Sequence, residues 1–222
     1  MYPYVKAIKA RFEQNADPAQ APAMKQYMRG QFEYLGIKTP QRGALLKELH
    51  AAHPLPEIGE LDAVLRELWG LPEREFQYAG IALLGRFDRR LPSGFAETLQ
   101  FLICTKSWWD TVDGIAAGTV GAHFRRYPAV RRKYLVRWRK AENVWLRRTT
   151  LLFQLNYRED TDFDLLSALI RENLGSREFF IHKAIGWALR QYARTDPDAV
   201  RRFVAATPDM HPLSRREAAK HL

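Results

Sequence analysis

The stretch Ser107-Trp108-Trp109-Asp110-Thr111-Val112-Asp113 begins one of four segments of the chain that resemble one another. In each segment an aromatic residue is followed seven residues later by an apolar or aromatic residue. The pairs are Phe76/Leu83, Trp108/Ile115, Trp145/Leu152 and Phe180/Trp187. Seven residues are two turns of a helix, so the pairing alone indicates only amphipathic helices. The spacing of the leading aromatics, 32, 37 and 35 residues, is more specific.

A period of this length with two helices per unit is typical of helical repeats. Strand signals are nearly absent, since no apolar alternation is bounded by Asn-Gly or Asp-Gly turns. The sequence therefore predicts an all-α fold, an α-solenoid of HEAT-like antiparallel helix pairs with a concave basic groove. A compact helical bundle is the alternative. We expect one domain, residues 1–222.

Capping signals predict where several helices begin. Thr39 precedes Pro40, and Asp196 precedes Pro197, the arrangement of a capping residue before a proline in the first helical turn. Ser214-x-x-Glu217 has the spelling of a capping box at the start of a terminal helix.

The composition limits the class of protein. The chain has 222 residues, of which 46% are hydrophobic, so it is expected to fold around a sizeable core. No apolar run is long enough to span a membrane, and the first residues do not resemble a signal peptide. Cys104 is the only cysteine, which fits a reducing, cytoplasmic setting. Its apolar neighbours predict a buried, inert thiol.

Positive charge is concentrated in one segment. The net charge is +10, and residues 124–148 contain ten lysines and arginines against one acidic residue, Glu142. A basic stripe of this kind is typical of proteins that bind a polyanion, and nucleic acid is the favoured partner. The alternative is a solvated basic face that only aids solubility.

The opening stretch also places an unusual pair of side chains on one helix face. Trp109 and Asp113 are four residues apart, so the indole and the carboxylate lie one above the other. Trp108 points about 100° away and is expected to be the core aromatic of its repeat. Asp110 is about 60° from Asp113, which argues against an acid/base pair. The small residues at 114–118 would let a bulky partner approach closely.

The later repeats add cations and a third indole. Either Arg147 or Arg148 is expected to face the cleft, and the spacing alone does not decide which. Trp187 and Arg190 are three apart and share a helix face. Taken singly, an ordinary core tryptophan and solvated arginines are the competing interpretations. His50 and His53 have no local third ligand, so a metal site is not expected, and no phosphate-binding glycine loop is present.

Several longer motifs give the chain a resemblance that extends over essentially its whole length. The chain resembles the AlkD-type DNA alkylation-repair glycosylases, a family with HEAT-like repeats. The matching motifs are Tyr27-Met28-Arg29, Tyr34-Leu35-Gly36-Ile37-Lys38-Thr39-Pro40, Arg74-Glu75-Phe76-Gln77-Tyr78, Lys106-Ser107-Trp108-Trp109-Asp110-Thr111-Val112-Asp113, Trp145-Leu146-Arg147-Arg148 and His182-Lys183-Ala184-Ile185-Gly186-Trp187-Ala188-Leu189-Arg190.

The resemblance implies hydrolysis of the N-glycosidic bond of cationic alkylated purines, such as 3-methyladenine and 7-methylguanine, in duplex DNA and without base flipping. It implies that Asp113 is catalytic, that Trp109 and Trp187 cradle the deoxyribose, and that Arg148 holds a backbone phosphate. DNA contacts are expected at Tyr27, Lys38, Thr39, Arg147, Arg148 and Arg190.

The chemistry of such a reaction agrees with these residue types. A cationic purine leaves without protonation, and the positive charge that develops on the sugar is stabilised by a fixed carboxylate and by indole faces. No cofactor is expected. No lysine is evidently placed as a nucleophile, which predicts a monofunctional enzyme. A monomer is expected because the groove is to wrap DNA. The alternative function is a non-catalytic HEAT-type scaffold that binds nucleic acid or protein.

Overall fold

The computed structural model describes residues 1–221, so the last residue of the predicted 1–222 domain lies outside the described range. Within residues 1–221 the regular structure is entirely helical. The β-type pairing in this range is a single isolated bridge between Glu33 and Glu73. The fold is all-α and of the α-solenoid class, as the repeat period predicts. The chain divides into two compact units, Met1–Thr98 and Leu99–Leu222, with the boundary inside helix α6 (Ala96–Cys104).

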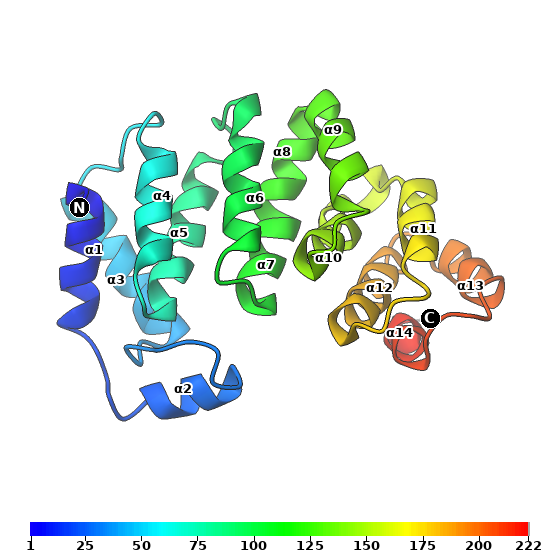
Figure 1. Cartoon of the computed structure of the whole chain (residues 1–222), viewed down its shortest axis with the longest axis horizontal. Coiled ribbons are helices and arrows are strands. Elements are labelled where there is room, and N and C mark those ends of the chain that lie inside the picture. The colour runs from blue at the N-terminus through cyan, green and yellow to red at the C-terminus, as the bar shows by residue number, and fades with distance from the viewer. Residues whose placement is uncertain (222) are drawn as a thin grey trace. The chain divides into compact units, whose positions relative to one another are not determined.

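Unit 1 contains five α-helices and a short 3-10 turn (Figure 1). Its core is formed where α1 packs against α3, α4 and α5. The rings of Phe12 and Phe76 stack there with centroids 5.8 Å apart, and Trp69 is fully buried. The elements are α1 (Pro3–Glu13), α2 (Ala21–Tyr27), α3 (Thr39–Ala52), α4 (Leu61–Gly70), α5 (Arg74–Phe87) and η1 (Ser93–Phe95).

A buried carboxylate fixes the loop between α2 and α3. Glu75, in the first turn of α5, accepts hydrogen bonds from the backbone N–H groups of Leu35, Gly36 and Ile37 at 3.1, 2.9 and 3.1 Å. Gly36 has a positive φ of 90°, and a Cβ there would collide with the carbonyl of Asp17. Two motifs that are distant in sequence therefore meet, and Glu75 determines where residues 34–38 lie.

Unit 2 contains the remaining helices (Figure 1). Four of them, α7, α10, α12 and α14, form one row. In this row α10 packs against α7 and α12, and α12 packs extensively against α14. The helices between them, α9, α11 and α13, pack as their partners. The elements are α7 (Trp109–Ile115), η2 (Ala116–Val120), α8 (Gly121–Arg126), α9 (Pro128–Trp138), α10 (Val144–Leu152), η3 (Arg158–Asp160), α11 (Phe163–Glu172), α12 (Phe179–Tyr192), α13 (Pro197–Ala205), α14 (Pro212–Ala218) and η4 (Ala219–His221).

The leading aromatics of three repeats touch one another. The ring centroid of Trp108 lies 5.7 Å from that of Trp145 and 5.0 Å from that of Phe180, and Trp145 and Phe180 are also 5.0 Å apart. These positions therefore occupy equivalent places in successive repeats, which confirms the sequence period. Aromatic clusters with centroid distances of this size stabilise the packing beyond the area they bury.

The capping predictions had mixed outcomes. The side chain of Asp196 accepts from the Ala199 N–H at 2.8 Å, as expected for the cap of α13. Thr39 is the first residue of α3 rather than its cap. The Ser214-x-x-Glu217 capping box is wrong, because α14 already begins at Pro212 and the Ser214 hydroxyl donates to the carbonyl of His182 at 2.8 Å.

The prediction that Cys104 is buried is also wrong. Cys104 is the last residue of α6 and is exposed, whereas Leu102 and Ile103 are buried. The apolar neighbours misled because residue 104 lies about 100° further around the helix from Ile103. Partial burial still raises the pKa of the Cys104 thiol. Among the described residues, none of the helices is long and apolar enough to cross a membrane.

Candidate functional site

The row of helices in unit 2 carries a pocket of about 250 Å³. Four helices, α7, α10, α12 and α14, contribute its side chains, so it belongs to no single sequence motif. Two indoles, two carboxylates and three cations share the pocket with two phenylalanine rings. The lining residues are Trp109, Asp113, Arg148, Phe179, Phe180, Lys183, Trp187, Arg190 and Glu217.

Helix α7 presents Trp109 and Asp113 to this pocket from adjacent turns of one face, as their spacing predicts. Trp108 packs instead against Trp145 and Phe180, which confirms that the two neighbouring indoles point in different directions. Asp110 is not among the lining residues. It lies in the first turn of α7, where a carboxylate interacts favourably with the helix dipole.

The small residues after Asp113 form a π-helical turn, Ala116–Val120. Such turns widen the helix locally and are frequent at functional sites. The amide of Asn156 donates to the Ala117 carbonyl at 2.9 Å, so the turn is held from the segment after α10. The small residues predicted only a place of close approach, and the change in helix type was not predicted.

Arg148 holds the Asp113 carboxylate in a two-pronged ion pair. Its Nε lies 2.7 Å from Oδ1 and its Nη2 lies 2.8 Å from Oδ2, while Nη1 donates to the carbonyl of Phe180. The side chains are 4% and 14% exposed for Arg148 and Asp113, so the pair is largely desolvated while the carboxylate still faces the pocket. This bidentate geometry fixes the orientation of the carboxylate.

Burial raises the pKa of the Asp113 carboxyl, and the two hydrogen bonds from Arg148 oppose that rise. The negative charge of Asp110 adds to the rise. A carboxylate in such surroundings is poorly hydrated, so water screens its field weakly, and the bound guanidinium of Arg148 offsets part of its charge. In this structure the guanidinium of Arg148 binds Asp113, and the phosphate contact that the resemblance implies for it stays a prediction.

Glu217 is a second buried carboxylate of the pocket, and its place there was not predicted. Its Oε1 lies 3.0 Å from Lys183 Nζ and 2.9 Å from Lys220 Nζ, and its Oε2 accepts from Arg190. Chiefly through the hydrogen bond from Lys220, these cations lower the pKa of Glu217 to about 2. The capping-box spelling suggested a local role, and no sequence signal pointed to cations 27 and 34 residues away.

One lysine, Lys183, lines the pocket, a position that the sequence did not point to. Lys183 is the second residue of the motif His182–Arg190 and is two helical turns from Arg190 on α12. Its side-chain nitrogen forms an ion pair with Glu217.

The choice between Arg147 and Arg148 is decided by where each side chain lies. Arg148 lines the pocket, whereas Arg147 Nη1 donates to the carbonyls of Ala141 and Glu142 at 2.5 and 2.9 Å. Of the ten cations in the basic stripe, Arg148 is the one that lines the pocket. The positive charge at the pocket comes mainly from Lys183 and Arg190, which lie outside the stripe.

The other predicted DNA contacts belong to unit 1. Tyr27 ends α2 with 71% of its surface exposed. Lys38 and Thr39 are exposed at the start of α3, directly after the loop that Glu75 holds. Their roles stay predictions. His50 has a packing role, since its Nε2 lies 2.7 Å from the Tyr4 hydroxyl.

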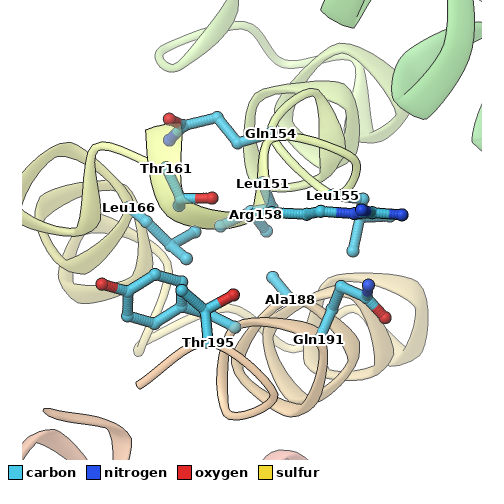
Figure 2. Close-up of a pocket in the computed structure, with 10 residues that line it drawn as sticks. Leu151, Gln154, Leu155, Arg158, Thr161, Leu166, Ala188, Gln191 and Thr195 are labelled. Carbon is cyan, nitrogen blue, oxygen red and sulfur yellow. The ribbon is translucent and has the colours of Figure 1, made fainter.

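Figure 2 shows a second hollow of unit 2, between the segment 151–166 and the end of α12. Its volume of about 10 Å³ is enough for roughly one water molecule. None of its ten lining residues, which include Arg158 and Gln191, is a carboxylate. This hollow is therefore far smaller than the pocket around Asp113 and lacks its acidic groups.

The fold and this pocket together define an all-helical repeat protein with a buried carboxylate beside two indoles. Residues 8–222 match the family model described as "DNA alkylation repair enzyme", and the chain belongs to this family. A solved structure described as "Predicted DNA alkylation repair enzyme from Enterococcus faecalis" is similar at 34% identity and a TM-score of 0.83, covering 93% of this chain and 96% of that one. No curated protein matches the chain significantly.

Proposed function

We propose that this member of the family is a monofunctional DNA glycosylase. It hydrolyses the N-glycosidic bond of purines that carry a positive charge after N3 or N7 alkylation, such as 3-methyladenine and 7-methylguanine, in duplex DNA. The observation that carries the proposal is the Asp113 carboxylate, fixed by Arg148 and facing a pocket that two indoles line. We infer a single domain acting as a cytoplasmic monomer.

The reaction needs no acid, because a cationic purine is already a good leaving group. As the bond between the base and C1′ breaks, the electron pair leaves with the base and positive charge develops on the deoxyribose. Asp113 stabilises that charge and orients the water that attacks C1′, and the proton that this water loses passes through the carboxylate to solvent. The indole faces of Trp109 and Trp187 attract the same charge. These roles require no metal or organic cofactor.

The size of the pocket supports a mechanism without base flipping. Its volume of about 250 Å³ is below the roughly 300–1,000 Å³ of pockets that enclose whole ligands. A sugar with its phosphate fits this space better than a complete extruded nucleotide. Selectivity then comes from the lability of the cationic lesion, so neutral lesions are expected to react weakly.

Release of 7-methylguanine from methylated duplex DNA tests the proposal. We expect Asp113→Asn to lose at least about 100-fold in single-turnover rate, because an oriented charge near the reacting carbon is lost. Its affinity for duplex DNA should change little. Asp110→Asn is the matched control, since it removes a neighbouring carboxylate that does not line the pocket.

Three outcomes would contradict the proposal. If the wild-type protein binds duplex DNA but releases no base, the scaffold function is favoured. If a chelator abolishes release, the cofactor-free mechanism is wrong. If borohydride traps a covalent complex with DNA, Lys183 or another amine acts as a nucleophile and the enzyme is not monofunctional.

A further inference from the structure

Glu217 joins two pocket cations that are seven residues apart on α12. Lys183 and Arg190 lie on the same face of that helix, and the carboxylate of Glu217 reaches both from α14. Lys220 contacts the same carboxylate but does not line the pocket. Three cations surround one carboxylate, so the cluster keeps an excess of two positive charges.

The backbone is built to bring this carboxylate close to α12. Gly186 lies between the two cations, and a Cβ there would collide with the Glu217 side chain and come within 2.9 Å of the Ser214 carbonyl. The Ser214 hydroxyl donates to the His182 carbonyl at 2.8 Å. Helix α14 therefore rests directly on the backbone of α12, and Glu217 itself is 8% exposed.

The exposure of the cations indicates which of them an anion can reach. Arg148 is 4% exposed at its side chain and is engaged by Asp113. The Lys183 and Arg190 side chains are 38% and 23% exposed, and both line the pocket next to Trp187. Long cationic side chains lose considerable rotamer entropy when they bind, and a fixed carboxylate reduces that loss by orienting them beforehand.

We propose that Glu217 is a positioning residue that holds Lys183 and Arg190 as a clamp for one backbone phosphate of DNA, next to the damaged nucleotide. This inference rests on the proposed function. Lys183 and Arg190 make the contact, and Glu217 acts through them. Lys183 and Arg190 together with Glu217 carry one net positive charge, which the single negative charge of a backbone phosphate balances.

The test measures binding to a duplex with a single tetrahydrofuran abasic-site analogue, which has no base to release. Fluorescence anisotropy gives the affinity and its salt dependence. We expect Lys183→Met to weaken binding about tenfold and to reduce the slope of log affinity against log salt by about one. Lys220→Met is the matched control, because it removes an ion pair with the same carboxylate from outside the pocket. It should change neither quantity appreciably.

The variant Glu217→Gln distinguishes orientation of Lys183 and Arg190 by Glu217 from a simple effect of net charge on DNA binding. The substitution adds one net positive charge, which by itself strengthens the binding of a polyanion. A positioning role predicts the opposite, namely weaker binding to the abasic-site duplex, since the clamp cations lose their orientation. Circular dichroism checks that the variant is folded.

Tighter or unchanged binding by folded Glu217→Gln would overturn the inference. So would an equal loss of affinity in Lys183→Met and Lys220→Met, a comparison that holds even if Glu217→Gln fails to fold. Since the probe carries no base, these results are independent of catalysis. An absence of base release by the wild-type protein overturns the proposed function and leaves the binding comparison intact.

Discussion

Asp113 is under two opposing influences. Burial raises the pKa of its carboxyl, and the hydrogen bonds from Arg148 lower it. The proposed reaction requires the ionised carboxylate, so Arg148 contributes to the rate by keeping the negative charge in place. A buried carboxylate whose cationic partner is removed tends to take up a proton.

Arg148→Gln therefore should move the acidic limb of the pH–rate profile to higher pH. The rate of base release falls as the pH decreases through the pKa of Asp113, and that pKa lies above the ordinary aspartate value of about 3.9. Without the guanidinium the pKa rises further, so activity is lost at a pH closer to neutral. Single-turnover release of 7-methylguanine at a series of pH values measures the shift. A limb that stays in place would assign it to another group.

At the scale of the elements, two close approaches hold the site and its neighbouring loop. Gly186 allows α14 to rest on α12, and the carboxylate of Glu75 organises the loop that precedes α3. Each is an interaction between elements that are distant in sequence. We expect a small substitution at either Gly186 or Glu75 to lower the free energy of unfolding.

Gly186→Ala should destabilise unit 2 by about 1–3 kcal/mol, because the added methyl group overlaps the Glu217 side chain. It should also weaken binding to the abasic-site duplex, since α14 carries Glu217. Gly85→Ala is the control, as no atom lies within 4 Å of its added Cβ and alanine favours a helix. Denaturant unfolding measures both variants. Equal effects would show that the contact between α12 and α14 is adaptable.

Glu75→Gln should lower the free energy of unfolding by about 1–3 kcal/mol, since one of its oxygens becomes an amide that faces a backbone N–H. The buried N–H of the loop then lacks an acceptor. Glu73→Gln, two residues earlier and half-buried, is the comparison. If Lys38 and Thr39 contact DNA as predicted, Glu75→Gln also weakens DNA binding. An unchanged unfolding midpoint would contradict the structural role.

At the scale of the whole molecule, the charges that favour general binding to DNA lie mostly apart from the charges at the pocket. The net charge of +10 favours association with DNA at any sequence. The basic stripe lies mainly on α8, α9 and the segment before α10, and Arg148 is its one member at the pocket. The other two cations that line the pocket, Lys183 and Arg190, lie on α12, outside the stripe.

Replacing Arg132, Lys133 and Arg137 of α9 together with glutamine should therefore affect lesion binding less than Lys183→Met alone. These three side chains are exposed and do not line the pocket. We expect the salt slope for the abasic-site duplex to fall by less than about one for the triple variant. A larger fall would show that α9 follows the DNA backbone, as the sequence hypothesis of a basic binding face states.

The sequence by itself determined the helical class, the repeat period and the face shared by Trp109 and Asp113. These features depend on local geometry, because residues three, four or seven apart have fixed relations on a helix. Only the tertiary structure decided that Arg148 holds Asp113, that Glu217 joins Lys183 and Arg190, and that Cys104 is exposed. Both the contacts and the exposure depend on how separate helices pack. The spacing of residues within one helix does not say which other helix will cover a given side chain.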